Sequence, residues 1–189
     1  MNLSHEVNRA GLRFRFALLV ISILSLVVVS ACGSDGESDS GFSKVQTDSV
    51  FRDLGSFDVA RFKKTKTYDV DELPGAVAAY MGYYKTPGSE PVQYELIMYS
   101  DHPTAITSGV TYAEEVTGAD ALLRSVDVRW KEGTKDRRGG GASRGGLTPV
   151  YGDFAVFGNV IILCEGRDSI QSLDRCEALL IGAGIIAAE

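Results

Sequence analysis

Residues 154–164 read FAVFGNVIILC, two apolar runs separated by one glycine and one asparagine. A two-residue connection of this composition is a strong signal for a tight β-hairpin, because both residue types accept the backbone angles of such turns. The second run, Val160–Cys164, is apolar at every position, so neither face of this strand suits contact with water. The sequence therefore predicts a hairpin whose second strand is central and buried.

A helix is predicted directly after this hairpin. Asp168 is suited to cap its first turn, and Gln171, three residues later, completes a capping-box pattern. One face of the helix carries Ile170, Leu173, Cys176 and Leu180, and Gly182 ends it. This spacing puts Cys176 on the buried side, facing the strand that ends at Cys164.

A second hairpin is predicted upstream. Residues 92–99, VQYELIMY, alternate with a period of two and have one mostly apolar face, which is typical of a strand. Residues 77–85 are rich in tyrosine and valine, and TPGSEP at 86–91 has turn chemistry. These features favour an antiparallel hairpin, with a helix over residues 77–84 as the competing interpretation.

A helix is expected to follow this hairpin as well. Asp101 can cap it, Pro103 fits its first turn, and Thr117-Gly118 ends it. Its apolar spacing uses Ile106, Val110, Ala113 and Val116, and residues 122–130 alternate as a third strand would. The predicted fold class is therefore α+β, an antiparallel sheet built from two hairpin-plus-helix units, with slight residue identity between the units.

Residues 131–146, KEGTKDRRGGGASRGG, contain no large aliphatic or aromatic side chain. A segment of this composition is expected to be a mobile loop outside the core. Its arginines among glycines resemble an RGG segment of RNA-binding proteins, but RNA is not expected outside the cytoplasm. A bland linker is one interpretation, and a cationic contact with anionic lipid, glycan or a partner protein is the other. The candidate partner-contact residues are Arg137, Arg138 and Arg144.

The N-terminus has the layout of an export signal. Phe16–Cys32 reads FALLVISILSLVVVSAC, and Arg9, Arg13 and Arg15 precede it. A basic segment, an apolar segment and small residues, in this order, are typical of a secretory signal peptide. The apolar run is shorter than the roughly 20 residues of a membrane-spanning helix. The remainder of the chain is expected to be exported.

The end of this segment, Val29-Ser30-Ala31-Cys32, resembles the lipobox of bacterial lipoproteins. The resemblance covers residues 1–32 and implies that Cys32 receives a lipid and becomes the mature N-terminus. Two or three acyl chains anchor a protein stably, since each buried CH₂ contributes about 0.8 kcal/mol. The implied organisation is a signal peptide (1–31), a flexible acidic spacer (32–41) and one domain (42–189). Its location would be the extracytoplasmic face of the cell membrane or the outer membrane.

The charge of the mature chain limits its partners. Removing Arg9, Arg13, Arg15 and Glu6 from 19 basic and 25 acidic residues leaves 16 and 24, a net charge of −8. Anionic headgroups repel such a domain, so the lipid on Cys32 must supply the attachment to the membrane. The same charge disfavours nucleic acid as a partner.

The cysteines predict a disulfide. With Cys32 consumed by lipid, Cys164 and Cys176 remain as an even pair in an oxidising compartment. A zinc site is not expected, because the mature chain has one histidine, His102, and no further thiol. The sequence predicts no cofactor.

Two catalytic patterns fail on their context. Gly141–Gly145 matches G-x-S-x-G, but this serine lies in a glycine tract and no histidine follows it. Ser100, Asp101 and His102 are triad residue types, but adjacent side chains cannot form the relay.

The favoured function is a lipid-anchored binding, sensing or envelope-structural domain. The alternatives are an accessory lipoprotein of a transport or secretion complex, and an envelope hydrolase that uses Asp69, Glu72 or Glu114.

Overall fold

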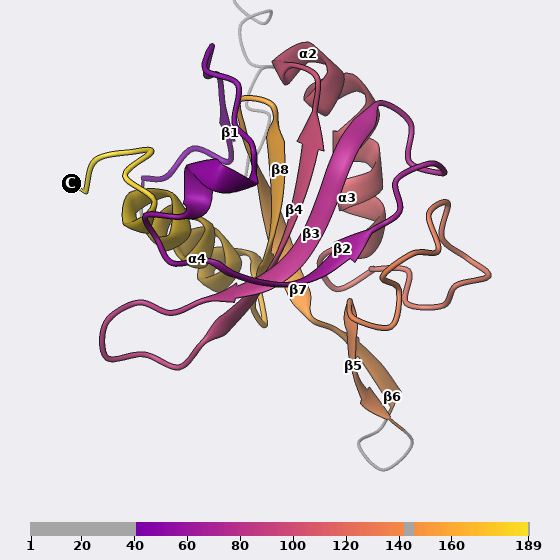
Figure 1. Cartoon of the computed structure of the whole chain (residues 1–189). Coiled ribbons are helices and arrows are strands. Elements are labelled where there is room, and N and C mark those ends of the chain that lie inside the picture. Colours follow the sequence, from indigo (N-terminus) through magenta and orange to yellow (C-terminus); the bar gives the residue numbers. More distant parts are fainter. Residues whose placement is uncertain (1–40, 142–145, 189) are drawn as a thin grey trace, which may run out of the picture. The chain divides into compact units, whose positions relative to one another are not determined.

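The computed structural model describes residues 41–141 and 146–188, and a six-stranded sheet lies at its centre (Figure 1). In sheet order the strands are β1 (Val45–Gln46), β7 (Tyr151–Phe157), β8 (Val160–Glu165), β4 (Val92–Tyr99), β3 (Ala76–Tyr84) and β2 (Lys63–Tyr68). β1 runs parallel to β7, and the four other neighbouring pairs of this sheet are antiparallel. The protein thus has mixed α and β content around a mostly antiparallel sheet, as predicted.

The hairpin predicted at residues 154–164 is confirmed as β7–β8. Phe157 pairs with Val160 across the two-residue turn, in which Gly158 has a positive φ of 53°. The side chain of Asn159 turns inward, where its Nδ2 donates to the carbonyl oxygens of Arg52 and Tyr99. β8 is third in the sheet and buried up to Cys164, so the prediction of a central strand also holds.

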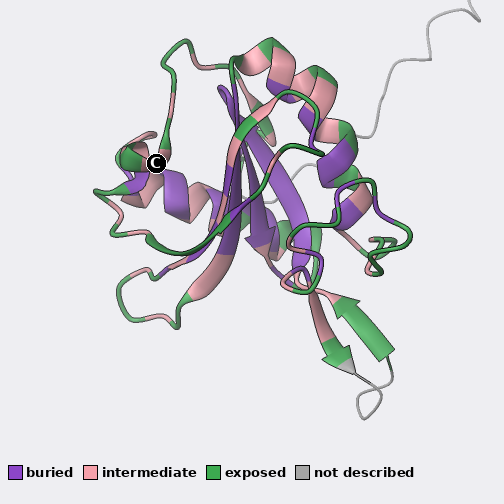
Figure 2. Ribbon diagram, turned by 45° about the vertical axis from the view of Figure 1, so that its right-hand side comes forward, coloured by how far each residue is buried: buried purple, intermediate pink, exposed green. Residues whose placement is uncertain are grey.

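The second hairpin is confirmed as β3–β4, so the alternative of a helix over residues 77–84 is wrong. β4 is buried on both faces. Tyr94, Leu96 and Met98 contribute to one core, and Ile97 and Tyr99 contribute to the core on the other face. Figure 2 shows this burial along the central strands.

Helices cover both faces of the sheet (Figure 1). α4 (Ser169–Gly182) packs on the face of Leu96 and Ile162. The opposite face is covered by a segment of three consecutive parts, α2 (His102–Thr104), η2 (Ala105–Gly109) and α3 (Val110–Val116). Asp168 and Asp101 cap the two helical segments as predicted, by accepting from the N–H groups of Gln171 and Thr104. The bond from Gln171 holds the pKa of Asp168 below its ordinary range, and hydrogen bonding by the side chain and then the backbone N–H of Thr104 does the same for the pKa of Asp101.

The element η2 is a π-helical turn. At Gly109 a Cβ would lie 2.6 Å from the ring of Tyr99 and 2.4 Å from Ile161, so the helix approaches the sheet at a residue without a side chain. A π turn inserts an extra residue and shifts the helical phase. Accordingly Tyr112, Ala113 and Val116 are buried, whereas Ile106 and Val110 are only partly buried.

Two predicted segments differ from the structure. Residues 122–130 form turns, not a strand, and of their side chains only Val128 and Trp130 are buried. The segment predicted as a mobile loop is ordered from residue 131 to 141, where Arg137 is buried in the core. Its end belongs to a two-stranded hairpin of β5 (Arg138–Gly141) and β6 (Gly146–Pro149), which projects from the sheet in Figure 1.

The outer edge of the sheet is the lysine-rich strand β2. Lys63, Lys64 and Lys66 are exposed on it, and the pairing with β3 shifts register between Lys64 and Lys66. Charged side chains and bulges at an edge strand prevent pairing with other chains. The short 3₁₀ helix η1 (Leu54–Phe57) precedes β2 and buries Phe57 against the α4 face.

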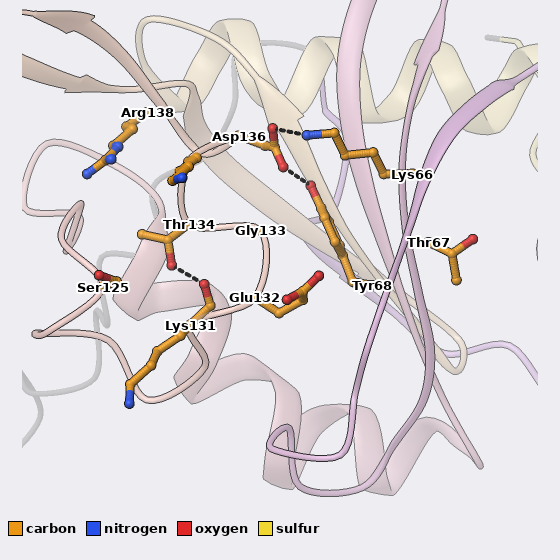
Figure 3. Close-up of a pocket in the computed structure, with 11 residues that line it drawn as sticks. Lys66, Thr67, Tyr68, Ser125, Lys131, Glu132, Gly133, Thr134, Asp136 and Arg138 are labelled. Atoms are coloured by element: carbon orange, nitrogen blue, oxygen red, sulfur yellow. Dashed lines mark hydrogen bonds and ion pairs between the residues drawn. The ribbon is translucent and has the colours of Figure 1, made fainter.

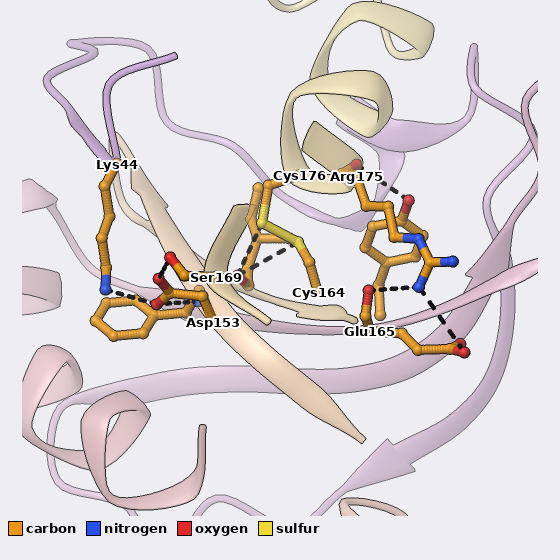
Figure 4. Close-up of a disulfide and its surroundings, with 10 residues drawn as sticks. Lys44, Asp153, Cys164, Glu165, Ser169, Arg175 and Cys176 are labelled. Carbon is orange, nitrogen blue, oxygen red and sulfur yellow. Dashed lines mark hydrogen bonds and ion pairs between the residues drawn. A yellow bond between two sulfur atoms is a disulfide. The ribbon is translucent and has the colours of Figure 1, made fainter. Parts of the chain in front are cut away.

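The predicted disulfide is confirmed between Cys164 at the end of β8 and Cys176 in α4, with the two Cα atoms 5.7 Å apart (Figure 4). Both sulfur atoms are buried. Beside the disulfide, Asp153 of β7 pairs with Lys44 and accepts a hydrogen bond from Ser169. These links attach α4 and the segment before β1 to the centre of the sheet.

Several predictions concern residues outside the described ranges: the signal peptide, Cys32, the acidic spacer and Arg144. Within residues 41–141 and 146–188, no helix has the length and apolar character needed to cross a membrane.

The disulfide is expected to stabilise the fold measurably. Replacing both cysteines by alanine (Cys164→Ala with Cys176→Ala) should lower the free energy of unfolding by about 3 kcal/mol, because the bridge restricts the unfolded chain. Urea denaturation measures this change. Adding reductant should lower the stability of the wild type and leave the variant unchanged; an equal effect on both would contradict the prediction.

Candidate functional site

A buried ion pair between Glu95 and Arg137 forms the centre of the candidate site. Glu95 lies in the middle of β4 and is 0% exposed, and Arg137 is 1% exposed. The Nε and Nη2 atoms of Arg137 donate to the two carboxylate oxygens of Glu95 over 2.9 and 2.8 Å. A bidentate pair of this kind is among the strongest hydrogen-bonded contacts in proteins.

Three aromatic rings surround the guanidinium group. The Cζ atom of Arg137 lies 4.6 Å from the ring centroid of Trp130, 5.4 Å from that of Tyr112 and 5.6 Å from that of Tyr68. The Trp130 ring meets both tyrosine rings edge to face, and its Nε1 donates to the carbonyl oxygen of Asp69. Cation–π attraction therefore adds to the ion pair and partly replaces the lost hydration of the guanidinium.

Burial dominates the electrostatics of this cluster. It raises the pKa of Glu95, and the neighbouring guanidinium of Arg137 opposes that rise. For Arg137 burial disfavours the charge, but the attraction of Glu95 prevails and raises the pKa above its ordinary value. Burial, reinforced by the charge of Glu95, also raises the pKa values of Tyr68 and Tyr112, so both hydroxyls stay neutral.

Arg137 holds the segment that we call the Arg137 loop (residues 131–137). Its only other buried side chain is that of Thr134. The loop closes over the guanidinium, which donates from Nη1 to the carbonyl oxygen of Glu132 over 2.6 Å. Gly133 has a φ of +71°, and a Cβ there would lie 2.6 Å from Nη2 of Arg137 and 2.8 Å from the ring of Tyr68. Only glycine fits this close approach.

Asp136 connects the loop to strand β2. Its carboxylate pairs with the ammonium group of Lys66 and accepts a hydrogen bond from the hydroxyl of Tyr68 over 2.7 Å (Figure 3). Its backbone carbonyl accepts from Nε2 of Gln93 over 2.9 Å, and the same nitrogen donates to the hydroxyl of Tyr151. The loop is thus attached to β2 and β4 at two successive residues.

A pocket of about 430 Å³ lies beside this loop (Figure 3). Strand β2, the Arg137 loop, the first residue of β5 and the preceding turn contribute to its walls. The lining residues are Lys66, Thr67, Tyr68, Ser125, Lys131, Glu132, Gly133, Thr134, Lys135, Asp136 and Arg138.

The pocket contains cations without an acidic partner. Among the described residues, no carboxylate forms an ion pair with Lys131, Lys135 or Arg138. Arg138 is held in place by a hydrogen bond from Nη1 to the carbonyl oxygen of Leu123 over 3.1 Å, which leaves its charge uncompensated. These side chains can bind an anionic group.

The structure separates the three arginines predicted to contact a partner. Arg137 cannot do so, because its side chain is buried and committed to Glu95. Arginine is almost never fully buried unless it is paired. The composition of residues 131–146 gave no sign that Arg137 has a buried carboxylate partner. Arg138 is half-buried and lines the pocket, and Arg144 lies outside the described residues.

The side chains considered for catalysis are not brought together. Asp69, Glu72 and Glu114 do not line this pocket. Asp101 caps a helix, and Nδ1 of His102 lies 2.7 Å from the carbonyl oxygen of Gly158, so both have structural roles. In the described ranges, no group of three or more His, Cys, Asp and Glu side chains is placed to hold a metal ion.

Sequence reasoning missed Glu95, Tyr68 and Trp130 as parts of one site. One signal was present: Glu95 is the acidic residue inside the strand segment VQYELIMY. A carboxylate in a central strand requires a cationic partner or a hydrogen-bonding network. The location of that partner, 42 residues later in a glycine-rich segment, could not be read from the pattern.

The ion pair is expected to hold the Arg137 loop on the sheet. Arg137→Met should lower the free energy of unfolding by about 3–5 kcal/mol, because Glu95 is left buried without a partner. Combining it with Glu95→Met should cost less than Arg137→Met alone, since no buried charge remains. Urea denaturation of the three proteins measures these differences.

The matched control is Lys135→Met, an exposed position on the same loop. It should change stability by no more than about 0.5 kcal/mol. Equal stability of Arg137→Met and the wild type would show that the pair does not anchor the loop.

Comparison with known proteins identifies a family. A family model described as a family of unknown function (DUF6810) matches residues 53–182. No curated protein and no solved structure matches the chain. The matched range begins at the cap of η1, ends with α4, and includes Glu95, Arg137 and both cysteines of the disulfide. The chain therefore belongs to this family of unknown function.

Proposed function

We propose that the protein is a lipid-anchored extracytoplasmic domain that binds a small polar ligand in the pocket beside the Arg137 loop. The lipobox-like segment that ends at Cys32 supports the anchor and the location. The acidic character of the chain supports a tether that does not depend on attraction to anionic headgroups.

The observation that carries the binding role is a pocket of polar side chains on a rigid frame. The pocket has a volume of about 430 Å³, within the range of small-molecule sites. Its loop wall is fixed by the buried pair of Arg137 and Glu95, and its strand wall is β2. A binding site must be held in shape by its supporting contacts, and this loop meets that requirement.

An accessory role in a transport or secretion complex is the second candidate. The β5–β6 hairpin favours it, because the hairpin projects from the domain and its described residues are largely exposed (Figure 2). Arg138 at the base of this hairpin would bring a positive charge to a protein partner. The hydrolase alternative has less support, since its candidate carboxylates lie outside the pocket.

We also propose that the domain consists of two hairpin-plus-helix units. The first is β3–β4 followed by the α2–α3 segment, and the second is β7–β8 followed by α4. The units meet where β4 pairs antiparallel with β8. Their helices lie on opposite faces, whereas a two-fold axis perpendicular to the sheet would place them on one face (Figure 1). The likeness therefore lies in element order and not in rotational symmetry.

Lipid attachment is tested at Cys32. In cells supplied with labelled palmitate, the wild-type chain should be labelled and processed, and Cys32→Ala should remain an unlabelled precursor. The control, Cys164→Ala with Cys176→Ala, should retain the label because these cysteines form the disulfide. Label on the Cys32→Ala protein would contradict the anchor.

The pocket is tested by filling it. Ser125→Phe places a ring at the pocket wall, and Val126→Phe places the same ring on the next residue, which is 84% exposed and does not line the pocket. Native mass spectrometry of the mature protein extracted from envelopes should detect a retained ligand on the wild type and on Val126→Phe. The ligand should be lost from Ser125→Phe. Equal retention by all three proteins would exclude this pocket as the site.

A further inference from the structure

We propose that the pocket beside the Arg137 loop binds a phosphate group carried by a hydroxylated molecule. This inference rests on the proposed function, which makes the pocket the ligand site, and it adds the chemical class of the ligand. The charges of the lining residues, the hydroxyl groups between them and the size of the pocket lead to it.

The pocket is cationic in an acidic chain. Its lining includes four cations, Lys66, Lys131, Lys135 and Arg138, and two carboxylates, Glu132 and Asp136, a net charge of +2. The whole chain has a net charge of −6. A phosphate monoester has a charge of about −1.5 to −2 at neutral pH, whereas a carboxylate has a single charge. The local charge thus matches phosphate better than a carboxylate.

The negative charge of Asp136 is already balanced within the protein, so it does not cancel the positive charge of the other lining residues. Both oxygens of Asp136 are engaged, one by Lys66 and one by the hydroxyl of Tyr68. Burial raises the pKa of Tyr68, so this hydroxyl keeps its proton and remains a donor to Asp136. Lys131, Lys135 and Arg138 are left as the cations available to a ligand.

Arg138 is the best-positioned of these cations. One guanidinium nitrogen is held by the carbonyl oxygen of Leu123. The other guanidinium N–H groups form no ion pair with any described residue. An arginine fixed in this way loses little side-chain entropy when it binds the oxygens of a phosphate. Figure 3 shows Arg138 and Ser125 on the same side of the pocket.

The remaining lining suits hydroxyl groups. Ser125 and Thr134 bring hydroxyls to the wall, and the hydroxyl of Thr134 already donates to the carbonyl oxygen of Lys131. A hydroxyl that donates can still accept a hydrogen bond from a ligand. The volume of about 430 Å³ leaves space beyond one phosphate group. A polyol or sugar that carries the phosphate would fill that space.

Arg137 does not take part in ligand binding. Each of its three guanidinium nitrogens already donates within the protein, two of them to Glu95 and one to the carbonyl oxygen of Glu132, and the residue is 1% exposed. Its role is to hold the loop that presents Lys131 and Lys135. Variants of Arg137 would therefore change both the stability of the protein and its affinity for a ligand. The test uses exposed lysines instead.

The experiment titrates the mature lipidated protein in neutral detergent micelles with glycerol 3-phosphate. Trp130, the chain's only tryptophan, lies directly before Lys131, so its fluorescence reports on the pocket. Lys131→Gln with Lys135→Gln should weaken binding by about tenfold or more, since hydrogen bonds to charged groups contribute about 1.5–3 kcal/mol. Lys63→Gln with Lys85→Gln removes the same charge from two exposed lysines outside this pocket and should change affinity by no more than about twofold.

A gain-of-affinity variant tests the charge argument independently. Glu132→Gln removes the carboxylate for which no partner is found among the described residues, and it should strengthen binding by about twofold to tenfold. Its backbone carbonyl, which accepts from Arg137, is unchanged. Unchanged or weaker binding by this variant would contradict a phosphate next to Glu132.

Further probes distinguish the source of the phosphate. Tighter binding of glycerophosphoglycerol, a phosphodiester, would assign the site to a lipid headgroup, and tighter binding of glycerol 3-phosphate would assign it to a free monoester. Glycerate binding as tightly as glycerol 3-phosphate would overturn the phosphate assignment. The absence of saturable binding by any phosphate probe would also overturn it. The same holds if the Lys131/Lys135 and Lys63/Lys85 double variants lose equal affinity for glycerol 3-phosphate. A ligand still lost from Ser125→Phe in those cases would leave the pocket as the site and show that only the ligand class is wrong.

Discussion

The ion pair between Glu95 and Arg137 is the constraint on which the candidate site depends. Moving two charges into the interior costs several kcal/mol each, and their attraction offsets this only with good geometry and further hydrogen bonds. Both conditions hold here, because both oxygens of Glu95 accept from Arg137 in a bidentate pair and Nη1 of Arg137 also donates to the carbonyl oxygen of Glu132. Three aromatic rings surround the guanidinium as well. The Arg137 loop, in which Thr134 is the one other buried side chain, is thereby fixed on the sheet.

The site therefore has two parts, a frame from the sheet and α3 and the Arg137 loop that packs on it. The frame comes from the sheet and α3, which supply Tyr68, Glu95 and Tyr112. The loop supplies Lys131 and Lys135, two exposed lysines of the pocket, and Asp136 attaches it to β2 beside the buried pair. Because the loop contributes little apolar burial, its position depends on a few polar contacts. A cationic pocket can therefore exist in an acidic domain without a large basic surface.

Much of the fold could be predicted from local pattern. The Gly158-Asn159 turn, the alternation in β4 and the caps at Asp101 and Asp168 each follow from short-range chemistry. The disulfide followed from the pair of cysteines that remains beside Cys32, and helical phase places Cys176 against the sheet. Residues 122–130 show the limit of this reasoning, because their alternation resembles that of a strand although the segment forms turns. The helical phase of the α2–α3 segment also differed from the prediction, because a π turn lets Gly109 approach Tyr99.

The sequence by itself determined the apolar strands, the two hairpins and the cysteine pair, because these depend on neighbours within about a dozen residues. Only the tertiary structure decided the site. It joined Glu95 to Arg137 across 42 residues and brought β2 beside the loop, and it buried Arg137, which lies in a segment with the composition of an exposed loop. The physical reason is that a buried charge is stable only beside its partner, and the identity of that partner is a property of the folded chain.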